Sequence, residues 1–194
     1  MTTAADHIAV AVRVGGILDG LGIRHTIGGS IAASFAGEPR STIDIDFVAA
    51  LSHQFVNALV AALHPDFYVA EEALRRAIDT LGTANLIHQE SQIKVDLFVA
   101  GGTPLDEQQL ARRQRVDIGP GETIYIHPPE DILLQKLRWY RMGNEASDRQ
   151  WRDILGIIRT QGDRLDRAYL AANAPVIEVA ALLNRALEDA DAGS

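Results

Sequence analysis

Two aspartates separated by one apolar residue are the clearest chemical feature of this sequence. Asp44 and Asp46 alternate with large apolar side chains across residues 43–48, and this period of two predicts a β-strand with both acids on one face. Like charges a few ångströms apart oppose each other's ionisation, and a divalent cation between them removes that conflict. Because carboxylate oxygens suit Mg²⁺ or Mn²⁺, the pair predicts a metal site.

A third acid lies on a second alternating segment, residues 92–99. Its apolar side chains share one face, while Lys94 and Asp96 share the other. If the two strands are neighbours, Asp96 joins the first pair, and three carboxylates can hold one or two metal ions that bind a triphosphate and activate an oxygen. The alternative is that Asp96 is a solvated residue on a half-exposed sheet. Lys94 would either bind phosphate or neutralise the acids.

A small-residue turn, Gly28-Gly29-Ser30, precedes these acids. It lies between an expected strand over 23–28 and an expected short helix over 30–36. Such a turn presents backbone N–H groups at a helix N-terminus, and glycines let a phosphate approach the backbone closely. Ser30 could cap the helix or donate to a phosphate oxygen, although an ordinary strand-to-helix turn with a serine cap has the same sequence.

In this order, the turn, the acid pair and the later lone aspartate resemble the nucleotidyltransferase superfamily that includes DNA polymerase β. The form Arg-x-Thr-x-Asp-Ile-Asp at residues 40–46, with Lys136 inside Pro-Glu-Asp-Ile-Leu-Leu-Gln-Lys-Leu, is most similar to bacterial nucleotidyltransferases of the abortive-infection toxin type. The resemblance covers residues 23–155, which is most of the chain.

The resemblance implies Mg²⁺-dependent transfer of a nucleoside monophosphate from an NTP to a hydroxyl, with release of pyrophosphate. It leaves the acceptor open, since members of the superfamily modify RNA ends, proteins and small molecules, and a toxin would have an antitoxin protein as its partner. By resemblance, the metal ligands and catalytic residues are Asp44, Asp46 and Asp96, and the triphosphate is held by Gly28, Gly29 and Ser30. Asp96 would also help to deprotonate or position the acceptor hydroxyl.

Four further residues are candidates for nucleotide binding, each with an ordinary alternative. Arg40 contacts a phosphate or is simply solvated, and Thr42 orients an aspartate or merely suits a strand because it is β-branched. Lys94 has the two roles given above. Lys136 contacts the triphosphate or base, or is a surface lysine, and Asp153 is placed to pair with it or with Arg149.

The expected fold class is α+β, a nucleotidyltransferase-type mixed β-sheet flanked by helices, with a C-terminal helical subdomain. We expect residues 1–127 to form the catalytic core and residues 128–194 the appended helices. Outside the segments already named, the core is expected to contain helices over 6–21, 53–63 and 71–81 and strands over 66–70, 84–90, 114–118 and 122–127. The subdomain is expected to contain helices over 130–142, 147–160, 164–173 and 175–190.

Composition narrows the class of protein further. A chain of 194 residues with 47% hydrophobic residues can bury one sizeable core, and the lack of cysteine excludes disulfides and thiolate metal sites. No signal-type segment or long apolar run is present, so we expect a cytoplasmic protein that does not enter the membrane. The net charge of −8 argues against general coating of nucleic acid but allows an RNA acceptor on a local basic patch.

Other function classes remain open at this stage. One is a small-molecule enzyme, either an aminoglycoside-type nucleotidyltransferase or, more remotely, a glycosyltransferase that uses Asp-x-Asp for a nucleotide sugar. The glycine turn upstream favours nucleotidyl transfer. Another is a non-catalytic nucleotide-binding or antitoxin-partner protein with the same fold, against which the retention of all three acids argues, since a scaffold has no physical need for clustered carboxylates.

Overall fold

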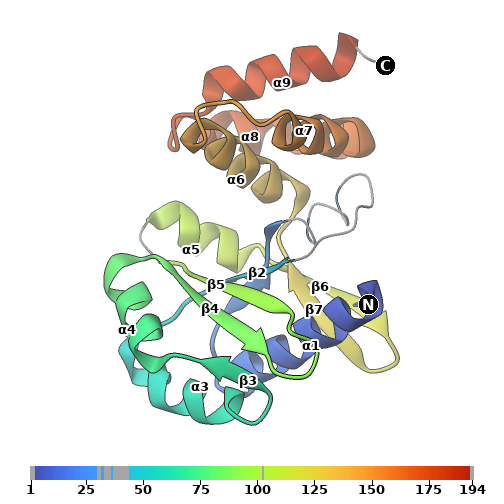
Figure 1. Cartoon of the computed structure of the whole chain (residues 1–194). Coiled ribbons are helices and arrows are strands. Elements are labelled where there is room, and N and C mark those ends of the chain that lie inside the picture. The colour runs from blue at the N-terminus through green and yellow to red at the C-terminus, as the bar shows by residue number, and fades with distance from the viewer. Residues whose placement is uncertain (1–2, 30–31, 33–35, 37–43, 102, 193–194) are drawn as a thin grey trace. The chain divides into compact units, whose positions relative to one another are not determined.

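The computed structural model describes residues 3–29, 32, 36, 44–101 and 103–192 (Figure 1). The described residues divide into two compact units. The first, the sheet unit, contains residues 3–29, 44–101 and 103–126, and the second, the helical unit, contains residues 127–192 together with Ala32 and Ala36. Each unit has its own apolar core.

A mixed β-sheet forms the centre of the sheet unit, which confirms the expected fold class. Within the described residues it has seven strands in the order β3-β4-β5-β2-β1-β7-β6 (Figure 1). The strands are β1 His25–Ile27, β2 Asp44–Ala49, β3 Phe67–Val69, β4 Thr83–His88, β5 Lys94–Val99, β6 Gln114–Gly119 and β7 Glu122–Ile126. β2 runs parallel to β5 and β1 runs parallel to β7, whereas the other neighbouring strands are antiparallel.

Helices of the sheet unit bury one face of the sheet. They are α1 Ala4–Gly20, α3 Val56–Leu63, which follows a 3-10 turn at His53–Phe55, and α4 Glu71–Thr80. Apolar residues of these helices share a core with alternate residues of β2 and β5; the set includes Val14, Leu59, Leu74, Ile45, Phe47, Val95 and Leu97. Because side chains alternate along a strand, the burial of these positions turns the intervening ones to the opposite face.

One helix of the sheet unit has no counterpart in the sequence prediction. α5 covers Pro104–Ala111 and begins with a capping box. Thr103 Oγ accepts a hydrogen bond from the N–H of Asp106, and the Asp106 carboxylate accepts one from the N–H of Thr103. The sequence Thr-Pro-x-Asp is the local signal for this start.

The helical unit consists of α6 Pro129–Met142, α7 Asp148–Gln161, α8 Arg167–Asn173 and α9 Ala180–Ala192 among the described residues. Its core includes Leu133, Leu137, Ile154, Ile158 and Leu183. The helix expected over 175–190 starts five residues later, because residues after Pro175 form a turn in which Glu178 has a positive φ of 59°. None of the described helices is both long enough and apolar enough to cross a bilayer.

Candidate active site

The register of β2 and β5 brings the predicted acids together on one face of the sheet. Asp46 lies directly beside Asp96, and Asp44 lies beside Lys94. Ile45 and Phe47 on β2, Val95 and Leu97 on β5 and Ile93 just before β5 are buried, so the charged side chains occupy the face opposite the core. Adjacent strands are roughly 4.8 Å apart, so Asp46 and Asp96 are immediate neighbours.

The glycine turn is fixed against the same acids. The N–H of Gly28 donates a hydrogen bond to the carbonyl of Asp46 at 2.8 Å, which extends the pairing of β1 with β2 by one residue. Gly29 has a φ of +57°, and a Cβ at this position would lie 1.6 Å from Oδ2 of Asp46. Both the backbone conformation and the space require glycine here, and the turn therefore reaches the Asp46 carboxylate itself.

Lys94 neutralises part of this acidic face. Its Nζ donates to Oδ2 of Asp96 at 2.9 Å. This hydrogen bond, reinforced by the negative charges of Asp96, Asp44 and Asp46 and opposed by partial burial, raises the pKa of Lys94 above its ordinary value. All three carboxylates therefore act on the one ammonium group.

The chemistry of the donor set, rather than its present arrangement, fits a hard divalent cation. Oδ1 of Asp96 is buried and has no hydrogen-bond partner in the described part of the chain, although a buried carboxylate oxygen normally has one. Carboxylate oxygens on adjacent strands are the ligands that Mg²⁺ and Mn²⁺ take. No group of three or more histidine, cysteine, aspartate or glutamate side chains among the described residues is arranged to hold a metal, and Lys94 is bonded to the other oxygen of Asp96.

A further polar residue on this face was not predicted from the sequence. Asn85 on β4 lies directly opposite Asp96, so Asp46, Asp96 and Asn85 form one row across three strands. Asn85 is exposed, and its amide can both donate and accept hydrogen bonds. The signal was the alternation within β4, where buried Ala84 and Leu86 turn Asn85 to the face of the sheet that carries Asp96.

Lys136 belongs to the helical unit, where it is buried. Its Nζ donates to Oδ2 of Asp153 at 2.9 Å, so α6 and α7 are joined by an ion pair. The sequence offered Lys136 and Arg149 as partners of Asp153, and the structure shows the ion pair with Lys136. A contact between Lys136 and a nucleotide stays a prediction.

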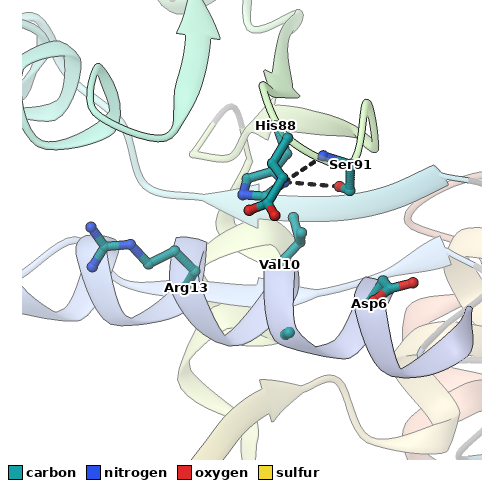
Figure 2. Close-up of a pocket in the computed structure, with 7 residues that line it drawn as sticks. Asp6, Val10, Arg13, His88 and Ser91 are labelled. Atoms are coloured by element: carbon teal, nitrogen blue, oxygen red, sulfur yellow. Dashed lines mark hydrogen bonds between the residues drawn. The ribbon is translucent and has the colours of Figure 1, made fainter. Parts of the chain in front are cut away.

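A separate hollow of about 520 Å³ lies between α1 and the β4–β5 turn (Figure 2). Several polar side chains that line it already have hydrogen-bond or ion-pair partners. The N–H of Ser91 donates to Nδ1 of His88, Ser91 Oγ lies 2.8 Å from the same nitrogen, and Arg13 pairs with Asp66. Its described lining residues include none of the predicted site residues, so the acidic face of the sheet remains the candidate site.

Solved structures resemble this chain over most of its length. They include an antigenic nucleotidyltransferase-like protein from Paracoccidioides brasiliensis, with a TM-score of 0.59 and 20% identity over 96% of this chain and 94% of that one. The antibiotic-resistance factor ANT(2'')-Ia in solution has a TM-score of 0.55 and 13% identity, covering 94% of this chain and 98% of its own. The lincosamide antibiotic adenylyltransferase LnuA has a TM-score of 0.50 and 11% identity, covering 80% and 96%.

These matches, together with the mixed sheet and its acid-bearing strands, decide the fold. It is a nucleotidyltransferase fold. By sequence alone the chain matches no protein-family model and no curated protein. The similarity therefore reaches the nucleotidyltransferase fold, and the toxin subtype suggested by the sequence stays a prediction.

Three of the predicted nucleotide-binding residues lie outside the described residues: Ser30, Arg40 and Thr42. The fold brings together the predicted site residues of the sheet unit that the structure describes. They lie on the turn after β1, on β2 and on β5, and are Gly28, Gly29, Asp44, Asp46, Lys94 and Asp96. Their roles in binding and catalysis stay predictions.

Proposed function

We propose that this protein is a metal-dependent nucleotidyltransferase that moves a nucleoside monophosphate from an NTP to an acceptor hydroxyl. The observation that carries the proposal is the contact between the Gly29 turn and the Asp46 carboxylate, next to Asp96 on the face of the sheet opposite the core. A phosphate-accepting turn and a pair of carboxylates need to meet in this way if they are to bind one triphosphate from two sides.

In this proposal Asp44, Asp46 and Asp96 hold Mg²⁺ or Mn²⁺. The bound cation supplies charge neutralisation and polarises the phosphate oxygens. In the same proposal the turn Gly28-Gly29-Ser30 binds the triphosphate through backbone N–H groups. Arg40, Thr42, Lys94 and Lys136 are the further nucleotide-binding candidates.

The reaction is a displacement at the α-phosphorus. The acceptor oxygen forms a bond to that phosphorus while the bond from it to the oxygen bridging to the β-phosphate breaks, so pyrophosphate leaves. The hydroxyl proton passes to a carboxylate oxygen of Asp96 and then to solvent. Asn85, opposite Asp96, is placed to hydrogen-bond the acceptor or the nucleotide sugar and so to orient it.

Two acceptor classes follow from different observations. The sequence resemblance to abortive-infection toxins favours an RNA end, and such a toxin would have an antitoxin protein as its partner. The similarity to ANT(2'')-Ia and LnuA favours a small antibiotic-like hydroxyl compound, and a protein with net charge −8 suits a cationic acceptor. In either case the same acidic face performs the transfer.

Transfer of label from each of four α-³²P-labelled NTPs tests the proposal, with Mg²⁺ or Mn²⁺, onto bacterial RNA, total protein, and aminoglycoside and lincosamide panels. The wild-type protein should label one acceptor class, and Asp46→Asn should label none. Asp117→Asn is the matched control, since it makes the same chemical change at an exposed position on edge strand β6. Absence of label with every acceptor, together with no binding of Mg²⁺–NTP by calorimetry, would contradict the proposal.

A further inference from the structure

The Lys94 ammonium forms an ion pair with Asp96, one of the carboxylates that would hold the proposed metal. Oδ2 of Asp96 accepts from the Lys94 ammonium at 2.9 Å, while Oδ1 is buried without a hydrogen-bond partner in the described part of the chain. Asp44 is the cross-strand neighbour of Lys94, and Asp46 is the neighbour of Asp96. The ammonium therefore sits among the three acids.

We propose that Lys94 is an exchangeable counter-ion of this site: it holds Asp96 while metal is absent, releases it when the divalent cation binds, and then binds the triphosphate. The inference rests on the proposed function, because it assumes that Mg²⁺ or Mn²⁺ binds at the three aspartates. It assigns to Lys94 both of the roles that the sequence left as alternatives, and it gives their order.

Geometry supports the first step. An oxygen that already accepts a hydrogen bond from an ammonium at 2.9 Å is not fully available as a metal ligand, since both cations approach along its lone pairs. The described residues contain no group of three side chains arranged to hold a metal, although three aspartates share one face. Release of Asp96 by Lys94 would free the third ligand.

The exposure of the lysine supports the exchange. The Lys94 side chain is 43% exposed, whereas that of Asp96 is 15% exposed, so the ammonium lies closer to solvent than the carboxylate it binds. A divalent cation carries twice the charge of the ammonium and can contact several carboxylate oxygens at once, so it competes with Lys94 for Asp96. The lysine stem is flexible, so the ammonium can leave Asp96 without movement of β5.

The second step follows from where Lys94 is left. Once free of Asp96, its ammonium stays on the face of the sheet that carries the acids, beside Asp44 on the neighbouring strand. The glycine turn adjoins Asp46 on the same strand as Asp44, so a triphosphate bound there lies within the field of that ammonium. Lysine is a common phosphate ligand that acts as a point charge.

Metal affinity measured without nucleotide tests the exchange. Binding of Mn²⁺ followed by electron paramagnetic resonance should be about tenfold tighter in Lys94→Met than in the wild type, since a competing positive charge a few ångströms away is lost. Lys94→Arg, which keeps the charge, should bind Mn²⁺ like the wild type. Arg13→Met is the matched control, because it removes a cation paired with Asp66 elsewhere on the sheet unit.

The second step has its own measurement. With Mn²⁺ saturating, Lys94→Met should bind a non-hydrolysable NTP about tenfold more weakly than the wild type, because a phosphate contact is lost. A residue with a merely structural role would not raise metal affinity and lower nucleotide affinity at once. Lys94→Gln, with its polar side chain, serves if Lys94→Met fails to fold.

Three results would overturn the inference. Equal Mn²⁺ affinity in Lys94→Met and wild type means that the ion pair does not compete with metal. Weaker affinity in the variant means that Lys94 helps to build the site. In both cases the wild type still binds Mn²⁺, so the proposed function stands while the inference fails. If the wild-type protein binds no Mn²⁺, with or without nucleotide, the metal-dependent function fails as well.

Discussion

The chain has two lysines, and each is paired with an aspartate at 2.9 Å, yet the two pairs lie in very different surroundings. In the sheet unit the Lys94 side chain is 43% exposed and faces three acids. In the helical unit the Lys136 side chain is 7% exposed and joins α6 to α7. The two pairs therefore share a bond length and differ in the burial of the lysine, while the two aspartates are similarly buried at 15% and 19% exposed.

The burial of each lysine leads to different expectations for the two pairs. A lysine near solvent that loses its carboxylate regains contacts with water, so loss of the ion pair costs the lysine little free energy. A buried lysine without its carboxylate is left with an uncompensated charge in a medium of low polarity, and removal of one partner of such a pair is strongly destabilising. We therefore expect changes at the Asp96 side to alter ligand binding and changes at the Asp153 side to alter stability.

The largest effects on transfer rate and on stability are expected when one aspartate is neutralised, Asp46 in the sheet unit or Asp153 in the helical unit. Asp46→Asn should lower the rate of nucleotidyl transfer by about a thousandfold, because loss of a metal ligand removes several kcal/mol of transition-state stabilisation. Its far-ultraviolet circular dichroism should match that of the wild type.

Asp153→Asn provides the contrast, since it should lower the free energy of unfolding while the transfer rate per folded molecule stays within about tenfold of wild type. Rates per folded molecule and urea unfolding of both variants check the pair. A large loss of stability in Asp46→Asn would remove the distinction between the two regions.

A second effect concerns Lys136. Lys136→Met should lower the free energy of unfolding by about 3 kcal/mol, because it breaks the buried ion pair of Lys136 with Asp153. The double variant Lys136→Met/Asp153→Leu should recover most of that loss, since it replaces the pair with apolar side chains. Urea unfolding of the single and double variants measures the coupling, and strictly additive losses would show that the pair is not a unit.

Substitution of Gly29, compared with that of Gly121, distinguishes the cost of a left-handed backbone from the effect of a side chain beside the Asp46 carboxylate. Gly29→Ala should cost about 1–2 kcal/mol for the left-handed backbone alone, and its Cβ would also displace the Asp46 carboxylate. Gly121→Ala is the matched control, because Gly121 also has a positive φ but nothing lies within 4 Å of the added carbon. Both variants should lose stability, and Gly29→Ala alone should lose Mn²⁺ and NTP binding, as measured by calorimetry.

The smallest effect is expected at Lys94 itself. Lys94→Met should lower the free energy of unfolding by less than Lys136→Met does in the absence of metal, because the Lys94 side chain is 43% exposed and that of Lys136 is 7% exposed. Urea unfolding beside Lys136→Met gives a direct comparison of the two lysines. A loss as large as that of Lys136→Met would show that the Lys94–Asp96 pair is structural.

The strands that carry the acids could be predicted because alternation encodes which side chains share a face. β2 and β5 follow the expected segments within two residues, with the buried positions that the pattern requires. The parallel register that sets Asp46 beside Asp96 could not be predicted from either segment alone, since pairing depends on the whole sheet. Asn85 was missed for the same reason, as its importance comes from its partner across the strands.

Burial of ionic groups was also beyond the reach of the sequence pattern. The apolar stripe of α6 is visible in the sequence. The burial of Lys136 depends instead on how α6 packs against α7, where Lys136 forms an ion pair with Asp153. The contact of Gly29 with Asp46 likewise depends on the hydrogen bond that extends β1 along β2. α5, in contrast, has a capping box that the sequence contained and that could have been used.

Chemical labelling of the two lysines in the unmodified protein tests the central claim most directly. An amine-reactive reagent with mass-spectrometric readout reports Lys94 and Lys136 separately in one sample. Addition of Mg²⁺ should increase the rate at Lys94, a further addition of a non-hydrolysable NTP should suppress it, and Lys136 should stay slow throughout. A Lys94 rate that responds to neither addition would contradict the exchange of Lys94 between Asp96 and the triphosphate.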